Sequence, residues 1–349
     1  MKIIRKIKSK FILATLLSGL LVSCIREIDL AIRVEKPVLV VDGMITNEAP
    51  PYIVKLTYTG IYEASNRINE NQAISGARIT LSDDQGKKTQ FEQVLEEPGK
   101  YQTNDPTFRG QTGRTYTLMI ELPNGEVYES TPEKLSEVPE INQVYSEFTE
   151  TGSGEQNVGY NVFLDTKDPK GVPNYYRWQA NGYRMRLTTG VFNPITGAMD
   201  NRQCWQAFRR ENIDIETDAD FDGNNVQKRL MIYSPAYTNA PYLVEVSQFS
   251  LSRDVYQFWR RMNEQLTRTG SIFDPLPSPV EGNISLKSDP NKLALGYFGA
   301  SAISRKKLVI YETDEAKRQR IEVSAQPFVL TGGCTVLFPG TTPFKPSGW

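Results

Sequence analysis

Residues 115–130 read TYTLMIELPNGEVYES and carry the clearest structural signal in the chain. Two strand-like segments, TYTLMIEL and EVYES, lie on either side of Asn124-Gly125. Asn-Gly pairs favour the primed turns that connect antiparallel strands, so this stretch predicts a β-hairpin.

Strand signals continue on both sides of this hairpin. PVLVV at 37–41 is a continuous apolar run suited to a buried strand, and YIVKLTY at 52–58 has the two-residue alternation of a half-buried one. The segments DDQG at 83–86 and EPG at 97–99 have the composition of turns. Six or seven short strands without an amphipathic helix therefore predict a β-sandwich of immunoglobulin or transthyretin type over residues 37–138.

A second β-rich domain is expected over residues 139–349, with one helix at about 251–268. Ser252 is a suitable N-cap for this helix, and Gly270 would stop it. Apolar side chains recur at helical spacing at Val255, Phe258, Trp259, Met262 and Leu266. We expect this stripe to pack in the core.

Histidine is absent from all 349 residues. Its absence excludes histidine-dependent hydrolases and histidine-ligated zinc sites. The sequence has no Ser-x-x-Lys or Gly-x-Ser-x-Gly signature in a convincing setting, and no phosphate-binding loop. It therefore predicts a non-catalytic protein without a cofactor, and an enzyme of unrecognised type stays an alternative.

The first 23 residues are typical of a signal peptide. Five cations lie between Lys2 and Lys10, no acidic residue precedes Cys24, and the apolar run at 11–22 is shorter than the about 20 residues that span a bilayer. Leu21-Val22-Ser23-Cys24 resembles the bacterial lipobox. This motif predicts acylation of Cys24, with residues 24–36 as a tether, and the alternatives are an uncleaved anchor or a coincidental cysteine.

Cleavage would remove five of the 40 basic residues and none of the 41 acidic ones, which leaves a net charge of −6. This balance argues against nucleic-acid binding. Cys204 and Cys334 would then lie in an oxidising compartment, where a disulfide is expected between them. Two separately buried thiols are the alternative.

An acidic turn, DADFDG at 218–223, is a candidate calcium site. Asp218, Asp220 and Asp222 alternate before Gly223, as oxygen ligands of Ca²⁺ do. The EF-hand pattern then fails, because Arg229 stands where the bidentate glutamate would be. Asp214, Glu216 or a distant carboxylate would have to complete the site, and an exposed acidic turn is the simpler reading.

Two aromatic clusters, YYRW at 175–178 and YSPAY at 233–237, are candidate stacking surfaces for sugars or peptides. Because strands also prefer aromatic residues, we expect them to pack inside the β-structure instead.

The chain resembles the Bacteroidota lipoprotein family called domain of unknown function 4249 over nearly its whole length. The resemblance rests on the order of individually weak motifs, which are Cys24, VVDG at 40–43, SGARITL at 75–81, PGKY at 98–101, GRTY at 113–116, NYYR at 174–177, YQFW at 256–259, GN at 282–283, LGYF at 295–298, the Cys334 region and PSGW at 346–349.

The resemblance implies a lipoprotein of the outer membrane, associated with a TonB-dependent receptor barrel. No catalytic residues are carried over from the family. We therefore expect a non-catalytic accessory or ligand-presenting subunit of an uptake system, with the extracellular face favoured over the periplasmic face. A structural or adhesive surface protein is the alternative, and the ligand is unknown.

Overall fold

The computed structural model describes residues 36–60, 72–150, 158–210, 212–235, 241–267, 279–311, 313–314, 330–346 and 349. The signal peptide, Cys24 and the predicted tether up to residue 35 lie outside these residues, as do Tyr237 and Gly270. The protein is mainly β, as predicted. Within the described ranges, no helix is long and apolar enough to cross a membrane.

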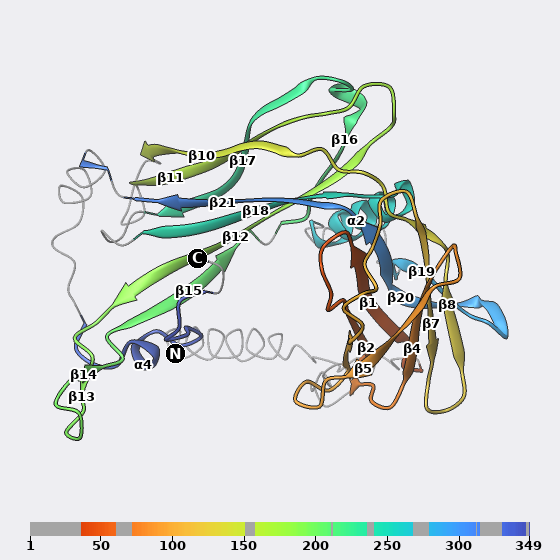
Figure 1. Cartoon of the computed structure of the whole chain (residues 1–349), viewed down its shortest axis with the longest axis horizontal. Helices are drawn as coiled ribbons and strands as arrows, with labels where there is room; N and C mark the ends of the chain where they lie inside the picture. Colours follow the sequence, from red (N-terminus) through yellow and green to blue (C-terminus); the bar gives the residue numbers. More distant parts are fainter. Residues whose placement is uncertain are drawn as a thin grey trace, which may run out of the picture. The chain divides into compact units, whose positions relative to one another are not determined.

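Nine strands form a closed mixed barrel in the order β1-β20-β19-β8-β7-β4-β5-β6-β2 (Figure 1). β1 pairs in parallel with β20 and antiparallel with β2, which completes the circuit. The barrel strands are β1 (Leu39–Thr46), β2 (Ile53–Tyr58), β4 (Arg78–Asp83), β5 (Lys88–Gln93), β6 (Lys100–Thr103), β7 (Thr115–Glu121), β8 (Val127–Ser130), β19 (Glu281–Leu286) and β20 (Asp289–Ser301). Two short strands, β3 (Gln72–Ala73) and β9 (Glu133–Lys134), pair with β2 and β7.

The hairpin predicted at 115–130 is confirmed as β7 and β8. Alternate residues of β7 are buried, and they join a core that fills the barrel. The two-sheet sandwich predicted for residues 37–138 is wrong, because these strands form one closed barrel. Two strands from residues 281–301 complete its sheet. Side-chain alternation identifies a strand but does not identify its partner, and a parallel partner can lie far away in the sequence.

Two glycines allow the barrel to close between β1, β19 and β20. Gly296 has φ +80°, and a Cβ there would lie 2.0 Å from the carbonyl oxygen of Val41. A Cβ on Gly282 would lie 1.8 Å from the carbonyl oxygen of Gly296. Only glycine fits such close backbone approaches. Asn283 then holds β20, because its side chain donates to the carbonyl of Phe298 (2.9 Å) and accepts from the N–H of Phe298 (3.0 Å).

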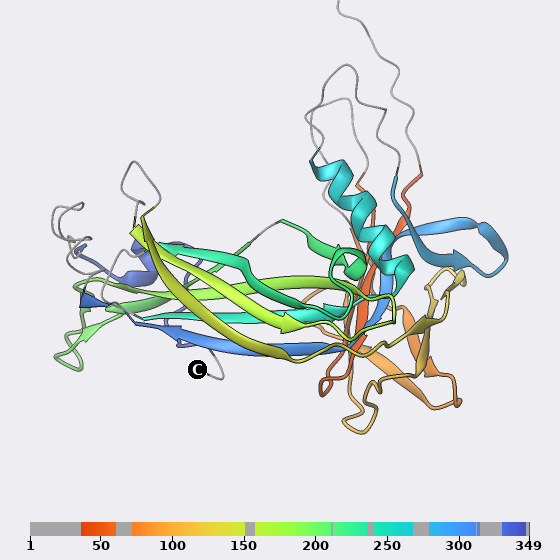
Figure 2. The same ribbon diagram turned by 90° about the horizontal axis from the view of Figure 1, so that it is seen from above.

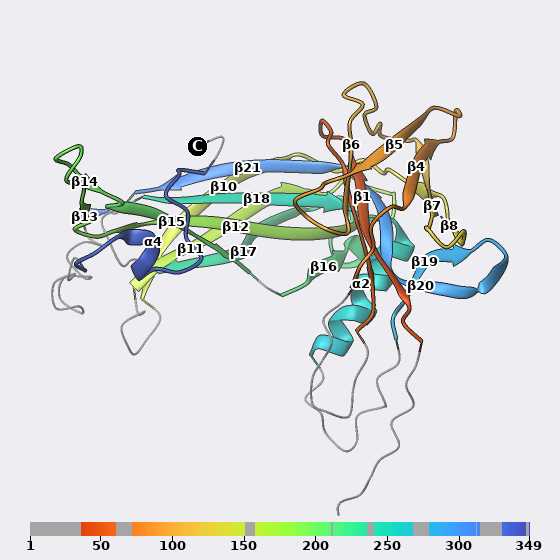
Figure 3. The ribbon, with the colours of Figure 1, turned by 90° about the horizontal axis from the view of Figure 1, so that it is seen from below.

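The second region, which we call the sandwich, consists of two packed sheets (Figures 2 and 3). One sheet has the order β10-β11-β17, and the other has the order β15-β12-β18-β21 with β16 also paired to β12. The strands are β10 (Ile141–Glu150), β11 (Val158–Lys167), β12 (Tyr175–Leu187), β15 (Gln203–Arg209), β16 (Asp214–Thr217), β17 (Asn225–Pro235), β18 (Tyr242–Ser250) and β21 (Ile303–Ile310). Side chains from both sheets form one core, which includes Val162, Trp178, Met231 and Val246.

Three smaller elements complete the sandwich. β13 (Val191–Phe192) and β14 (Met199–Asp200) form a hairpin, and η2 (Asp218–Asp220) is a single 3₁₀ turn. The short helix α4 (Cys334–Leu337) is joined to β15 by the predicted disulfide. This bond is confirmed, with Cys204 and Cys334 fully buried and their Cα atoms 5.7 Å apart.

The predicted helix is confirmed as α2 (Arg253–Leu266), two residues shorter at each end than expected. Ser252 caps it by accepting from the N–H of Val255 at 3.2 Å. The Ser252 hydroxyl also donates to the buried carboxylate of Glu133 at 2.9 Å, which links α2 to the barrel strand β9.

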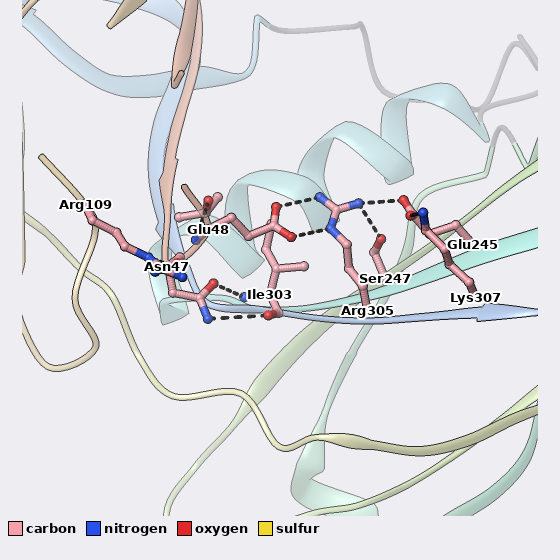
Figure 4. A network of polar contacts seen from close by, with 9 residues as sticks. Asn47, Glu48, Arg109, Glu245, Ser247, Ile303, Arg305 and Lys307 are labelled. Carbon is pink, nitrogen blue, oxygen red and sulfur yellow. Dashed lines mark hydrogen bonds and ion pairs between the residues drawn. The ribbon is translucent and has the colours of Figure 1, made fainter. Parts of the chain in front are cut away.

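A polar network joins the end of β1 to β18 and β21 (Figure 4). The Arg305 guanidinium donates to both carboxylate oxygens of Glu48, at 2.6 and 2.9 Å, and also to Glu245 at 2.9 Å. The Asn47 side chain accepts from the backbone N–H of Ile303 at 2.8 Å. The barrel and the sandwich are thus connected by charge-assisted contacts as well as by the chain itself.

Candidate functional site

A break in strand pairing produces a cleft in the sandwich. β16 pairs with Tyr175–Trp178 of β12, and β15 pairs with Asn181–Leu187 along the same edge. Strand pairing on this edge therefore stops at Gln179 and Ala180. A cavity of about 460 Å³ lies at the break, and we call it the Arg177 cleft.

The walls of the Arg177 cleft differ in chemistry. One wall is apolar and comes from α2, which contributes Trp259, Met262 and Leu266. The rest of the lining includes the polar residues Arg209, Arg210, Asn212 and Asp214. An amphipathic lining of this kind suits a ligand with both a charged and an apolar part.

Arg177 faces α2 because side chains alternate along β12. Its neighbours Tyr176 and Trp178 are buried in the sandwich core, so the Arg177 side chain lies on the other face. The guanidinium carbon is 4.1 Å from the centroid of the Trp259 ring and 5.8 Å from that of Phe249. These distances are typical of cation–π contacts.

Within the described part of the chain, no hydrogen bond or ion pair satisfies the Arg177 guanidinium. Burial lowers the pKa of Arg177 below its usual value, and the charge of Asp42 opposes this shift. By contrast, Arg210 donates to the carbonyl of Leu230 at 3.0 Å and contacts Asp214 at 3.4 Å. Arg229 binds Asp214 at 2.5 Å. Arg177 is therefore the half-buried cation whose donors are left for a ligand.

The sequence predicted that the aromatic residues at 175–178 pack inside, and this is confirmed. Tyr176 and Trp178 are buried, and the Trp178 indole donates to Gln248 at 2.8 Å. Tyr175 packs against Tyr256 of α2, with ring centroids 5.0 Å apart. The sequence included Arg177 in this candidate stacking surface but did not single it out as a cation that faces the helix. The sequence contained an indication of this role. Arg177 is a cation between two aromatic strand residues, so its side chain lies on the other face of the strand, where the aromatic stripe of the helix can pack.

A second feature involves the elements β13, β14 and α4, which lie close together (Figure 1). Exposed apolar side chains are found on and around these elements. We call it the apolar end, and its members are Val191, Phe192, Ile195, Met199, Leu330, Val336 and Leu337. Ile195 is 93% exposed and Val336 is 76% exposed. The backbone bridge Gly190↔Gly332 and the disulfide hold the two segments together. Exposed apolar patches on rigid surfaces commonly mark interaction sites.

The predicted calcium ligands are only partly brought together. Asp218 and Asp222 lie with Asp168, and their carboxylate oxygens are within 4.8 Å of one another. Asp220 is not in this group. Asp168, just after β11, is the distant carboxylate that the sequence could not name. The other two candidates, Asp214 and Glu216, instead bind Arg229.

The hydrogen bonds of these carboxylates give the cluster a structural role. Asp168 accepts from the Tyr176 hydroxyl at 2.5 Å and from the N–H of Gly223 at 2.9 Å. Asp218 accepts from the N–H of Asn174 at 2.7 Å, and Asp222 accepts from that of Gly171 at 2.6 Å. The cluster thereby fastens the loop after β11 to the turn before β17. Burial and the Asp168 contact raise the pKa of Tyr176.

Calcium binding at this cluster stays a prediction. A calorimetric titration with Ca²⁺ that gives no heat, together with a melting temperature that does not change with calcium, would contradict it. A larger cavity of about 890 Å³ borders Asp168 and is lined mainly by loops. Its lysines, Lys134, Lys167 and Lys170, are exposed, so its described lining has no cation as far buried as the half-buried Arg177.

The fold and these sites define a mainly β protein with a closed barrel, a sandwich, an amphipathic cleft and an exposed apolar end. No curated protein matches the chain at a significant level. The sequence model of the family described as Domain of unknown function (DUF4249) matches residues 25–307. The chain belongs to this family, as its motifs indicated.

Proposed function

We propose that this protein is a non-catalytic, lipid-anchored accessory subunit of a TonB-dependent uptake system in the outer membrane. The observation that carries the proposal is the apolar end, where a disulfide-fastened surface exposes large apolar side chains. We propose that this surface docks on the receptor. Its fastening by the disulfide and by the backbone bridge Gly190↔Gly332 supports docking, because a surface that is already formed loses little conformational entropy on binding.

The lipobox supports the anchored location. Acyl chains on Cys24 would confine the protein to the membrane plane and so raise its effective concentration near a receptor. On this proposal the body faces the cell exterior, where it would capture a ligand in the Arg177 cleft and present it to the receptor.

The chemistry of the Arg177 cleft favours binding over catalysis. Glycoside hydrolysis requires two carboxyl groups that face the scissile bond. Asp214 is the one carboxylate among the described lining residues, and it is occupied by Arg229 and Arg210. The remaining polar groups are guanidiniums and amides, which orient ligands without supplying a nucleophile.

Co-purification from native membranes tests the partner. An affinity-tagged chain is extracted in mild detergent, and its partners are identified by mass spectrometry. We expect a TonB-dependent receptor in near-equal amount, and at least a fivefold loss of it in a Phe192→Ser/Ile195→Ser variant. The matched control is Leu95→Ser, which removes an equally exposed apolar side chain (83%) from the barrel loops. A chain that always purifies alone, or a receptor lost equally from the control, would contradict the proposal.

A further inference from the structure

The guanidinium carbon of Arg177 lies over the Trp259 ring, 4.1 Å from the ring centroid. A cation–π contact does not occupy the N–H donors of a guanidinium. These five donors lie in the plane of the group, where they match the two oxygens of a carboxylate. Since these donors have no partner within the described residues, a ligand oxygen is the natural acceptor for them.

The inner end of the cleft has one unpaired positive charge, which matches a ligand with one anionic group. Asp214 and Glu216 together neutralise Arg210 and Arg229, and Arg209 lies exposed at the rim. Asp42 exerts an attraction on Arg177 but lies beyond ion-pair distance. One unpaired guanidinium balances a single negative charge. This favours a carboxylate over a doubly charged phosphate.

The wall formed by α2 indicates what the rest of the ligand looks like. Met262, Leu266 and the Trp259 ring offer apolar contacts directly beside the cation. A cavity of about 460 Å³ is within the usual range for small-molecule sites. A neutral polar ligand would leave the half-buried cation unpaired, and a bare anion would leave the apolar wall uncovered.

We propose that the Arg177 cleft binds a small ligand that carries one carboxylate on an apolar or aromatic body. The carboxylate meets the Arg177 guanidinium, and the body lies against α2. This inference deepens the proposed capture role and rests on it. It assigns Arg177 as the residue that determines specificity for acids over their neutral analogues.

Isothermal titration calorimetry of the purified mature chain tests the assignment with phenylacetate and its neutral isostere phenylacetamide. We expect phenylacetate to bind at least tenfold more tightly than the amide. Arg177→Met keeps the length of the side chain but removes the charge, and should weaken phenylacetate binding at least tenfold. Met262→Glu places a repelling charge on the exposed side of the wall, and should have a similar effect. The matched control is Arg260→Met, since Arg260 lies on α2 outside the cleft and should leave the affinity unchanged.

Three results would overturn the inference. The first is equal affinity for phenylacetate and phenylacetamide, and the second is phenylacetate binding that both cleft variants leave intact. The third is displacement of phenylacetate by inorganic phosphate at equal concentration. None of these results removes the proposed receptor association, because co-purification measures that separately. Conversely, a chain without a receptor partner that still prefers the acid would overturn only the proposed function.

Discussion

The barrel and the sandwich differ in strand pairing, because the sheet of the barrel is closed and one sheet of the sandwich has a break along β12. In the barrel, Gly282 and Gly296 let backbones approach closely enough to close the sheet. In the sandwich, pairing along the β15 and β16 edge of β12 stops at Gln179 and Ala180, and a cleft lies at this break. On the proposed function, the barrel is a scaffold and the sandwich carries the binding surface. The side chains around the break line an open space, whereas those inside the barrel fill a core.

The largest effect is expected from removing the disulfide of the sandwich. The bond closes a loop with a sequence separation of 130 residues. In the chain-entropy description, such a loop contributes roughly 4 to 5 kcal/mol to stability. We expect the Cys204→Ala/Cys334→Ala variant to lose stability on this scale in chemical denaturation. Reductant should destabilise the native chain and leave the variant unchanged. Equal sensitivity of both to reductant would contradict this role.

Closure of the barrel is tested by Gly296→Ala. The added Cβ meets the Val41 carbonyl oxygen at 2.0 Å and φ is positive, so we expect a loss of about 3 kcal/mol or more. Gly86→Ala is the matched control, because φ is also positive there but nothing lies within 4 Å of the new Cβ. It should lose about 1 kcal/mol, measured by urea unfolding. Equal losses would show that the close approach contributes nothing.

A pH effect is expected from Glu133 at the base of α2. Burial raises the pKa of its carboxyl, despite hydrogen bonds from Tyr297 (2.6 Å) and Ser252 (2.9 Å). A raised folded-state pKa means that the stability contributed by the protonated form is fully present below the ordinary glutamate pKa. This contribution is lost as pH rises through the folded-state pKa.

Glu133→Gln removes this dependence. Relative to the native chain, the variant should gain stability as pH rises above the ordinary glutamate pKa, and the gain should level off once Glu133 is ionised in the folded protein. Unfolding in urea at several pH values measures the difference. A native chain and variant whose stabilities change in parallel with pH would refute the prediction.

The smallest effect is expected at the connection between the two regions. Arg305 makes a bidentate contact with the carboxylate of Glu48 (Figure 4), so Arg305→Met should lower the free energy of unfolding by about 1 kcal/mol. The control is Arg78→Met on the barrel, where a more exposed pair with Glu121 should contribute less than half of that. Thermal unfolding of both variants ranks them, and the reverse order would contradict this connection.

Local features of the fold were predictable from the sequence. The hairpin at Asn124-Gly125, the helix capped by Ser252 and the disulfide each depend on neighbouring residues or on the count of cysteines. The closure of the barrel was not predictable, because alternation along β1 does not reveal that β20 is its neighbour.

The site was less predictable than the fold. Asp168 joins Asp218 only through pairing between distant strands, and Arg177 meets Trp259 only when α2 packs on β12. The apolar residues of the apolar end look in sequence like any other strand residues. Their exposure follows from tertiary structure, which a pattern in one segment does not contain.

The proposed function depends most on the anchor at Cys24, and metabolic labelling with a radioactive fatty acid tests this anchor directly. We expect label on the native chain, none on a Cys24→Ala variant, and release of that variant from the membrane fraction. A native chain that never incorporates label, together with a Cys24→Ala chain that sediments with the envelope as before, would contradict the account.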